Sequence, residues 1–394
     1  MFKKTVFAFS VCLLSFAAYG QTDEVTSVLL EIEQNNESLK AYTSLKESMQ
    51  LELKSGNNLP DPQAGAYYLP FGNHASGDYS EFQVTQSLEF PTVYGVRNSL
   101  IEKQKLQMEL EYELKRQEVL LPAKMHCIQL IHLNKRRVVE QLRVTQAKRI
   151  FDQVQELFET EQVGILEVNK SKIAWMQEQF KVAQVDSDRK SIGLLLQNLN
   201  GGKEIVFNQT DYTEDLKLGT MDSIWQIRQS TDPEIKILTQ QDEVARQQIK
   251  LSKSKSLPNL TAGFNYQGLS GSNYSGVYGG LSIPLWSNRN KVKAAEARYQ
   301  YQQSHSSAQS LAAYASFQNQ YNEYQILFDK FNEYESTLEG LNSDSLLLEA
   351  YELGEIGFMA YYTELQFYRQ AVDTMLEMEK QLNQIKIEIL KHQL

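Results

Sequence analysis

Two neighbouring residues in this sequence are candidate ligands for a soft metal ion. His126 is followed directly by Cys127, and methionines are scattered through the chain. Imidazole, thiolate and thioether groups bind transition metals, but a site needs several of them at ligand-like spacing. No such cluster of His, Cys and Met occurs in the sequence. We therefore interpret both residues as packing residues, and we expect no metal site and no cofactor.

Three glutamates suggest a different kind of chemistry. Glu349, Glu352 and Glu355 recur at short, regular intervals near the end of a long helical stretch. Such a group attracts cations when it lines the mouth of a channel, or it solvates an exposed helix face, and the sequence leaves both interpretations open. No nucleophile–base pair, phosphate-binding loop or carboxylate dyad stands in a recognisable context, which argues against an enzyme.

The first 20 residues (1–20) are typical of a secretory signal peptide. Lys3 and Lys4 form a basic start, an apolar run covers 6–18, and a small-x-small cleavage site covers 18–20. Cleavage would leave Cys127 as the only cysteine, so no intramolecular disulfide can form. The formal net charge of −10 argues against nucleic acid as a partner. No later segment has the apolar run that a membrane-spanning helix needs, so the chain would have to enter a membrane as strands.

The sequence shows one pattern twice. Leu59-Pro60 opens a strand-like segment in the first half, and Leu257-Pro258 opens one in the second half. Further matches follow in the same order, and the two members of each pair are separated by the same number of residues. They are Phe90-Pro91 with Ile283-Pro284, and Phe158, Gly164 and Leu166 with Tyr351, Gly357 and Met359. Self-similarity of this kind indicates a repeated architecture. We predict a first repeat over 21–200 and a second over 231–394, separated by an irregular insert at 201–230 that forms a belt around the middle.

Each repeat contains two segments with the alternating pattern of a strand. The predicted strands cover 63–71, 79–90, 259–268 and 274–285. Phe82, Val84 and Leu88 alternate with polar residues in the second strand. Val277, Leu281 and Ile283 alternate with small or polar residues in the fourth. Because only one register puts the apolar face of every strand outward, we predict that these six residues face lipid.

Very long helical stretches follow the second strand of each repeat. They cover 93–158 and 288–353, and the second one carries seven-residue ladders typical of coiled coils. At roughly 1.5 Å per residue, each helix is about 100 Å long, which exceeds an ordinary globular core. The chain then turns and returns through helices at 165–199 and 358–392. The remaining predicted helices cover 24–54 and 232–256.

Four strands cannot close a membrane barrel, because closed barrels begin at about eight strands and open edges are not tolerated in lipid. Two copies would give a barrel filled with side chains, whereas three copies would give twelve strands and a lumen. The predicted fold is therefore mixed and mainly α. Long coiled-coil helices form an α-barrel, four strands per protomer contribute to a shared twelve-stranded membrane β-barrel, and the assembly is a homotrimer with a two-fold internal repeat in each chain.

The chain resembles the outer-membrane efflux protein family, the TolC-like channels, over essentially its whole mature length. The Leu-Pro step before each first strand, the Pro after each second strand, and Tyr351 with Gly354 at the second helix tip carry this resemblance. It implies a passive exit duct in the outer membrane that extends into the periplasm. It also implies a periplasmic adaptor (membrane fusion) protein and an inner-membrane transporter of the resistance-nodulation-division class as partners. The tract 90–94 (FPTVY) further resembles channels of heavy-metal cation pumps.

The resemblance also implies a gate at the periplasmic helix tips. In relatives, a Tyr just before the second tip bonds an acidic residue just after the first tip, and alignment carries these roles to Tyr351 and Glu167. A Glu in the first turn of a helix is favoured in any case by the helix dipole, so Glu167 has a purely structural explanation as well. The first tip departs from the pattern, because Glu161 stands where a Gly is expected.

A function of another class is also compatible with the long helices. The chain would then be a soluble periplasmic coiled-coil adaptor or a surface scaffold. The strands argue against it, because a soluble protein has no reason to expose Phe82, Val84 and Leu88 on one face.

Overall fold

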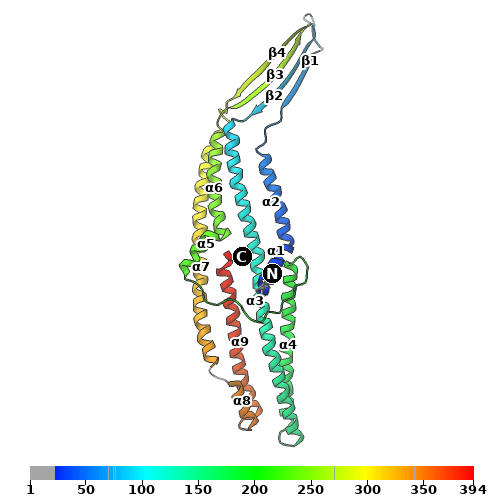
Figure 1. Ribbon diagram of the computed structural model, residues 1–394, viewed down its shortest axis with the longest axis vertical. Coiled ribbons are helices and arrows are strands. Elements are labelled where there is room, and N and C mark those ends of the chain that lie inside the picture. Colours follow the sequence, from blue (N-terminus) through cyan, green and yellow to red (C-terminus); the bar gives the residue numbers. More distant parts are fainter. Residues whose placement is uncertain (1–22, 70, 74, 76, 270, 340–342) are drawn as a thin grey trace, which may run out of the picture.

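The computed structural model describes residues 23–69, 71–73, 75, 77–269, 271–339 and 343–394. The molecule is elongated, with a β-sheet at one end and helices along the rest of its length (Figure 1). The predicted signal peptide at 1–20 lies outside the described residues. The helices are α1 (Glu24–Asn35), α2 (Glu37–Ser55), α3 (Pro91–Glu159), α4 (Ile165–Leu199), α5 (Met221–Thr231), α6 (Pro233–Ser254), α7 (Lys291–Glu339), α8 (Ser343–Glu352), α9 (Phe358–Ile389) and the 3₁₀ helix η1 (Lys391–Gln393). The strands are β1 (Gln63–Leu69), β2 (Tyr79–Leu88), β3 (Asn259–Leu269) and β4 (Ser272–Ser282).

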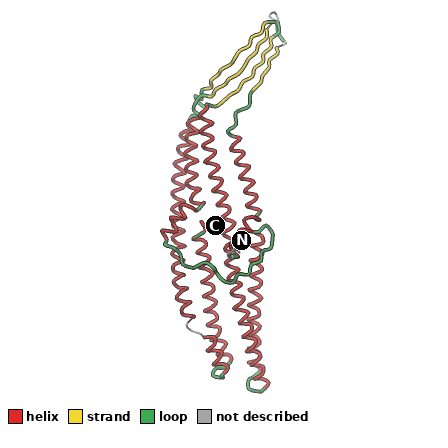
Figure 2. Tube along the Cα trace, in the orientation of Figure 1, coloured by secondary structure: helices red, strands yellow, loops and turns green. Residues whose placement is uncertain are grey.

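The strands form one antiparallel sheet in the order β1–β2–β3–β4 (Figure 2). They lie where the alternating pattern predicted them, although their ends differ by a few residues. The strand predicted over 274–285 ends at Ser282, so Ile283 lies outside β4, and its assignment as a strand residue is wrong. Pro284 explains this end, because a proline has no N–H with which to continue the ladder.

The register places most apolar residues of the sheet on one face; Leu69 and Leu269, both opposite Tyr79, are on the other. Val84 of β2 is opposite Phe264 of β3, which in turn is opposite Val277 of β4. Directly opposed residues of antiparallel strands point to the same side of a sheet. The same face carries Phe82 opposite Tyr266, Leu88 opposite Leu260, and Leu260 opposite Leu281.

Two predicted helices are divided in the structure. The helix predicted over 288–353 corresponds to α7 and α8, with 340–342 outside the described residues. The helix predicted over 24–54 ends at Asn35 and restarts at Glu37. Asn36 causes this break, because its backbone is extended (φ −63°, ψ 117°) and its side chain accepts a hydrogen bond from the Leu39 N–H at 3.0 Å, which caps α2.

The insert predicted to be irregular over 201–230 is partly helical. Its last part forms α5, so the prediction is wrong there. The Thr220 hydroxyl caps α5 by accepting from the Ser223 N–H at 3.4 Å, and Trp225 packs against Phe317 of α7 with ring centroids 5.3 Å apart. This burial of apolar side chains stabilises a helix that is too short to show a clear period in the sequence.

The part of the insert before α5 crosses the molecule at its middle (Figure 2). Side chains of the long helices hold its backbone in place. Lys386 of α9 donates to the Asp215 carbonyl at 2.7 Å, and Asn134 of α3 donates to the Gln209 carbonyl at 2.9 Å. The segment therefore ties α3 and α9 together at mid-height.

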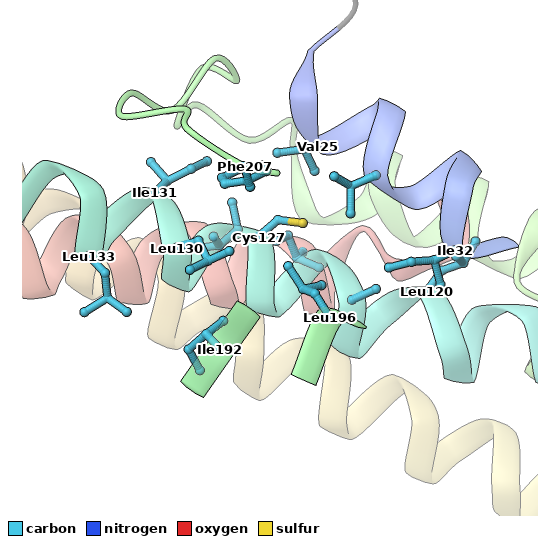
Figure 3. Close-up of a cluster of buried hydrophobic side chains, with 14 of the residues drawn as sticks. Val25, Ile32, Leu120, Cys127, Leu130, Ile131, Leu133, Ile192, Leu196 and Phe207 are labelled. Atoms are coloured by element: carbon cyan, nitrogen blue, oxygen red, sulfur yellow. The ribbon is translucent and has the colours of Figure 1, made fainter. Parts of the chain in front are cut away.

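A hydrophobic cluster under this belt joins several parts of the chain. Cys127 of α3 lies within it, together with Val25 of α1, Leu196 of α4 and Phe207 of the belt (Figure 3). Ile387 of α9 belongs to the same cluster. The first helix, α1, and the last α-helix, α9, thus meet at the middle of the molecule. None of the described helices is both long enough and apolar enough to cross a membrane.

Candidate functional site

Two tight turns lie at the end of the molecule opposite the sheet (Figure 1). One joins α3 to α4 and the other joins α8 to α9. In the first, the Gln162 N–H donates to the Leu157 carbonyl at 2.9 Å, and in the second the Glu355 N–H donates to the Ala350 carbonyl at the same distance. These bonds are typical of a Schellman helix end, whose turn residue is left-handed.

The turn residues themselves are Glu161 (φ 59°) and Gly354 (φ 75°). Both turns therefore have the same backbone geometry, although only the second has the glycine that this conformation favours. Glu161 adopts a conformation that costs a non-glycine residue on the order of 1 kcal/mol. The first tip therefore has Glu161 in place of the glycine of the family pattern, but the backbone conformation of the turn is the same.

The predicted gate residues Glu167 and Tyr351 line one cavity between the two turns. The cavity has a volume of about 950 Å³. Burial, followed by the negative charge of Glu167, raises the pKa of the Tyr351 hydroxyl. Among the described residues, however, no hydrogen bond joins the two side chains. The Glu167 Oε2 atom accepts from the Gly164 N–H at 3.1 Å, as a helix-start acid does, and the Tyr351 ring stacks on Tyr361 with centroids 5.1 Å apart.

An ion pair that sequence reasoning missed crosses the same cavity. Arg149 of α3 donates from Nη2 to Oε1 of Glu352 of α8 at 2.6 Å. Glu352 was one of the three acids considered as a cation-attracting group, and here it binds a cation of its own chain. Glu349 and Glu355 are exposed. Nothing in the sequence pairs Arg149 with Glu352, because the two belong to different helices and the pairing depends on how these helices pack.

Above the tips, a buried group of charged side chains joins α9 to α3 and α4. Arg369 of α9 donates from Nη1 to Glu178 of α4 at 3.0 Å and from Nη2 to Gln146 of α3 at 3.1 Å. Glu178 is fully buried and Arg369 is 4% exposed. The Arg369 side chain thus binds two other helices while itself almost fully buried.

A second arginine completes this group. Arg143 of α3 donates to Glu140 at 3.0 Å, to Asp373 of α9 at 3.2 Å, and to the Arg369 carbonyl at 3.3 Å. Glu140 is also fully buried, whereas the Asp373 side chain is 37% exposed. We call Glu140, Arg143, Glu178, Arg369 and Asp373 the ion cluster. Glu178 lies eleven positions beyond Glu167 on α4, so the two residues are roughly 16 Å apart along the helix axis.

The residues first considered as metal ligands have a different environment. Cys127 is fully buried in the central cluster, and burial raises the pKa of its thiol to about 12, which disfavours the thiolate that a metal requires. Burial lowers the pKa of His126. Within the described part of the chain, no group of three or more His, Cys, Asp or Glu side chains is placed to hold a metal ion.

No protein-family model matches this sequence, and no curated protein matches it either. Solved structures do match. CusC, described as forming a transmembrane channel, shares 13% identity at a TM-score of 0.74, with 93% of this chain and 92% of CusC covered. The outer-membrane protein VceC from Vibrio cholerae shares 12% identity at a TM-score of 0.73, with 93% and 96% covered. The CmeC outer-membrane channel from Campylobacter jejuni shares 13% identity at a TM-score of 0.71, with 94% and 85% covered.

The likeness to these structures is one of fold. It spans nearly the whole of this chain and most of each of the three proteins. The single chain therefore has the same fold as the chains of these structures, mainly helical with one four-stranded antiparallel sheet.

Proposed function

We propose that this protein is an outer-membrane channel, the exit duct of an efflux system, and that three copies close into a ring to form it. One observation carries the proposal. Both the sheet and the helical part of the molecule end in the same two side edges. Along one edge lie β1, α2 and α4, and along the other lie β4 and α7 (Figure 1). A molecule built in this way is completed by a second copy placed edge to edge, and repetition of that contact gives a ring.

The sheet shows why closure is needed. Within the described chain β1 pairs with β2 and β4 pairs with β3, so the outer side of each edge strand keeps unpaired backbone groups. One face of this sheet is apolar, and lipid offers no partner for open edges. Because β4 runs antiparallel to β1, β4 of one copy can continue the antiparallel order onto β1 of the next. Three copies give a twelve-stranded barrel with a lumen.

The outer face of α4 supports the same ring. Leu166, Ile173, Phe180 and Leu194 fall on one seven-residue repeat of α4, interrupted by Ser187, on the side that points away from α3, and each of the four is more than half exposed. An exposed apolar line with this spacing is typical of a helix that packs against another helix. In the ring its neighbour is α7 of the next copy.

Charge supports this pairing. The exposed face of α4 carries Lys170, Lys172 and Lys190. The second half of α7 is rich in acids, with Glu323, Asp329, Glu333, Glu335 and Glu339. Opposite charges on two surfaces favour their association and fix its orientation.

The duct would conduct solutes passively from the periplasm to the exterior. A periplasmic adaptor and an inner-membrane transporter of the resistance-nodulation-division class would deliver the cargo, as the family resemblance implies. Heavy-metal cations are the proposed cargo, and the tract 90–94 supports this. Deletion should then sensitise cells to a transition metal, whereas the purified protein should bind none tightly. A saturable metal site in the isolated trimer would contradict this assignment.

Fractionation and conductance test the proposed function. The protein should be recovered with the outer membrane as a heat-modifiable trimer and should form pores in planar bilayers. Phe180→Glu should lower the trimer yield, whereas Gln179→Glu, one residue away and off the apolar line, should not. Recovery of a soluble monomer with the periplasmic contents would contradict the channel and favour the alternative of a soluble adaptor or scaffold.

A further inference from the structure

Glu81 is the only Asp, Glu, Lys, Arg or His residue in β1, β2, β3 and β4 as the structure describes them. It lies in β2 between Ser80 and Phe82, so its side chain is on the face opposite the apolar one. Its direct partners across the sheet are Tyr67 of β1 and Gln267 of β3. A carboxylate thus stands on the polar face of an otherwise uncharged sheet.

The contacts of this carboxylate leave its charge uncompensated. The Tyr79 hydroxyl donates to Oε2, and Asn265 Nδ2 donates to Oε1 at 2.9 Å. Both donors are neutral, and Glu81 has no ion pair among the residues that the structure describes. The two hydrogen bonds hold the carboxylate in place, and its negative charge acts on whatever fills the space in front of the sheet.

Glu81 lies near the end of the sheet that is remote from the helices. It is the third residue of β2, whereas α3 follows the opposite end of that strand (Figure 1). In a ring that stands in the outer membrane, this position is close to the outer opening.

We propose that the Glu81 carboxylates, one from each copy, form an acidic ring inside the barrel and make the channel prefer cations. The inference rests on the proposed function, because only a closed ring gives the polar face a lumen. A charge on the lipid face of a barrel destabilises it, whereas a charge in the lumen tunes selectivity. Rings of Asp or Glu are a recurrent basis of cation preference in pores.

The expected effect follows from simple electrostatics. Three negative charges about one Debye length from the pore axis in 0.1 M salt raise the local cation concentration roughly two-fold and lower that of anions equally. Glu81→Gln removes the charge and keeps the length and an oxygen acceptor. The permeability ratio of K⁺ to Cl⁻ should therefore fall about four-fold.

The measurement is the reversal potential of the assembled channel in a KCl gradient across a planar bilayer. Gln83 lies on the same face of β2, two residues along, so Glu81→Gln combined with Gln83→Glu should restore cation preference. Glu204→Gln, which removes an exposed acid of the belt at the middle of the molecule, is the matched control and should leave the ratio unchanged.

An unchanged ratio in Glu81→Gln would overturn the acidic ring, and so would a ratio that falls equally in Glu204→Gln. These results leave the channel itself intact. If the unmodified protein forms no conducting pore, the proposed function fails instead, so the two failures are distinguishable.

Discussion

Replacing Arg369 by Met tests whether the ion cluster holds α9 to the other helices. Methionine retains an apolar stem but cannot donate to Glu178 of α4 or to Gln146 of α3. The Glu178 carboxylate would stay fully buried. Its remaining donors would be Lys181 Nζ and Gln366 Nε2, each 3.4 Å from Oε1.

The magnitude follows from burial. Removal of one partner from a buried ion pair typically destabilises a protein by about 3 to 5 kcal/mol, because the other charge is left uncompensated. Lys181 is about one-third exposed and still faces Glu178, so we expect the lower end, about 3 kcal/mol. Arg149→Met is the matched control. Arg149 is 60% exposed, and the loss of such a surface ion pair should cost less than about 1 kcal/mol.

Urea unfolding of the assembled protein in detergent, followed by the helical circular dichroism signal, provides the assay. The midpoint should shift clearly for Arg369→Met and little for Arg149→Met, with similar slopes. A double variant in which Glu178 also becomes Met should recover much of the loss, because no buried charge then remains. The reasoning is refuted if Arg369→Met is no more destabilising than Arg149→Met.

Three further predictions concern the sheet, the tips and the middle of the molecule. Val84→Arg on the apolar face should cost about 2 to 4 kcal/mol and lower the trimer yield, whereas Thr85→Arg on the polar face should not; equal yields would reject the assignment of faces. Tyr351→Phe combined with Glu167→Gln should raise single-channel conductance at unchanged trimer yield if the pair closes the gate; unchanged conductance would leave Glu167 as a helix-start residue. Burial lowers the pKa of His132 below 6.5, so its contribution to stability is full above about pH 6.5 and is lost as the pH falls through the folded pKa; the melting temperature of His132→Asn should therefore fall less between about pH 7.5 and 5.5 than that of the unmodified protein.

The local patterns of the sequence determined the elements and one face of the sheet. Phe82 and Val84 alternate with polar residues, and a period of two can be satisfied only by a strand with one apolar side. The sequence likewise predicted both turns, at 159–164 and 354–357, and the helix ends in the structure differ from these bounds by one residue, because a helix end depends on neighbouring residues. The break at Asn36 was missed, since a single capping side chain leaves the surrounding helical pattern unchanged.

Only the tertiary structure decided which distant residues meet. Arg369 and Glu178 lie in different halves of the chain, and each could equally have been an exposed helix charge. Their burial depends on the packing of α9 against α3 and α4. The environment of Glu81 was likewise decided by the fold, because strand pairing supplies Asn265 as a hydrogen-bond donor and places no cation beside the carboxylate among the described residues. Periodicity is a property of neighbouring residues, whereas charge compensation is set by contacts across the fold, and the sequence alone does not specify those contacts.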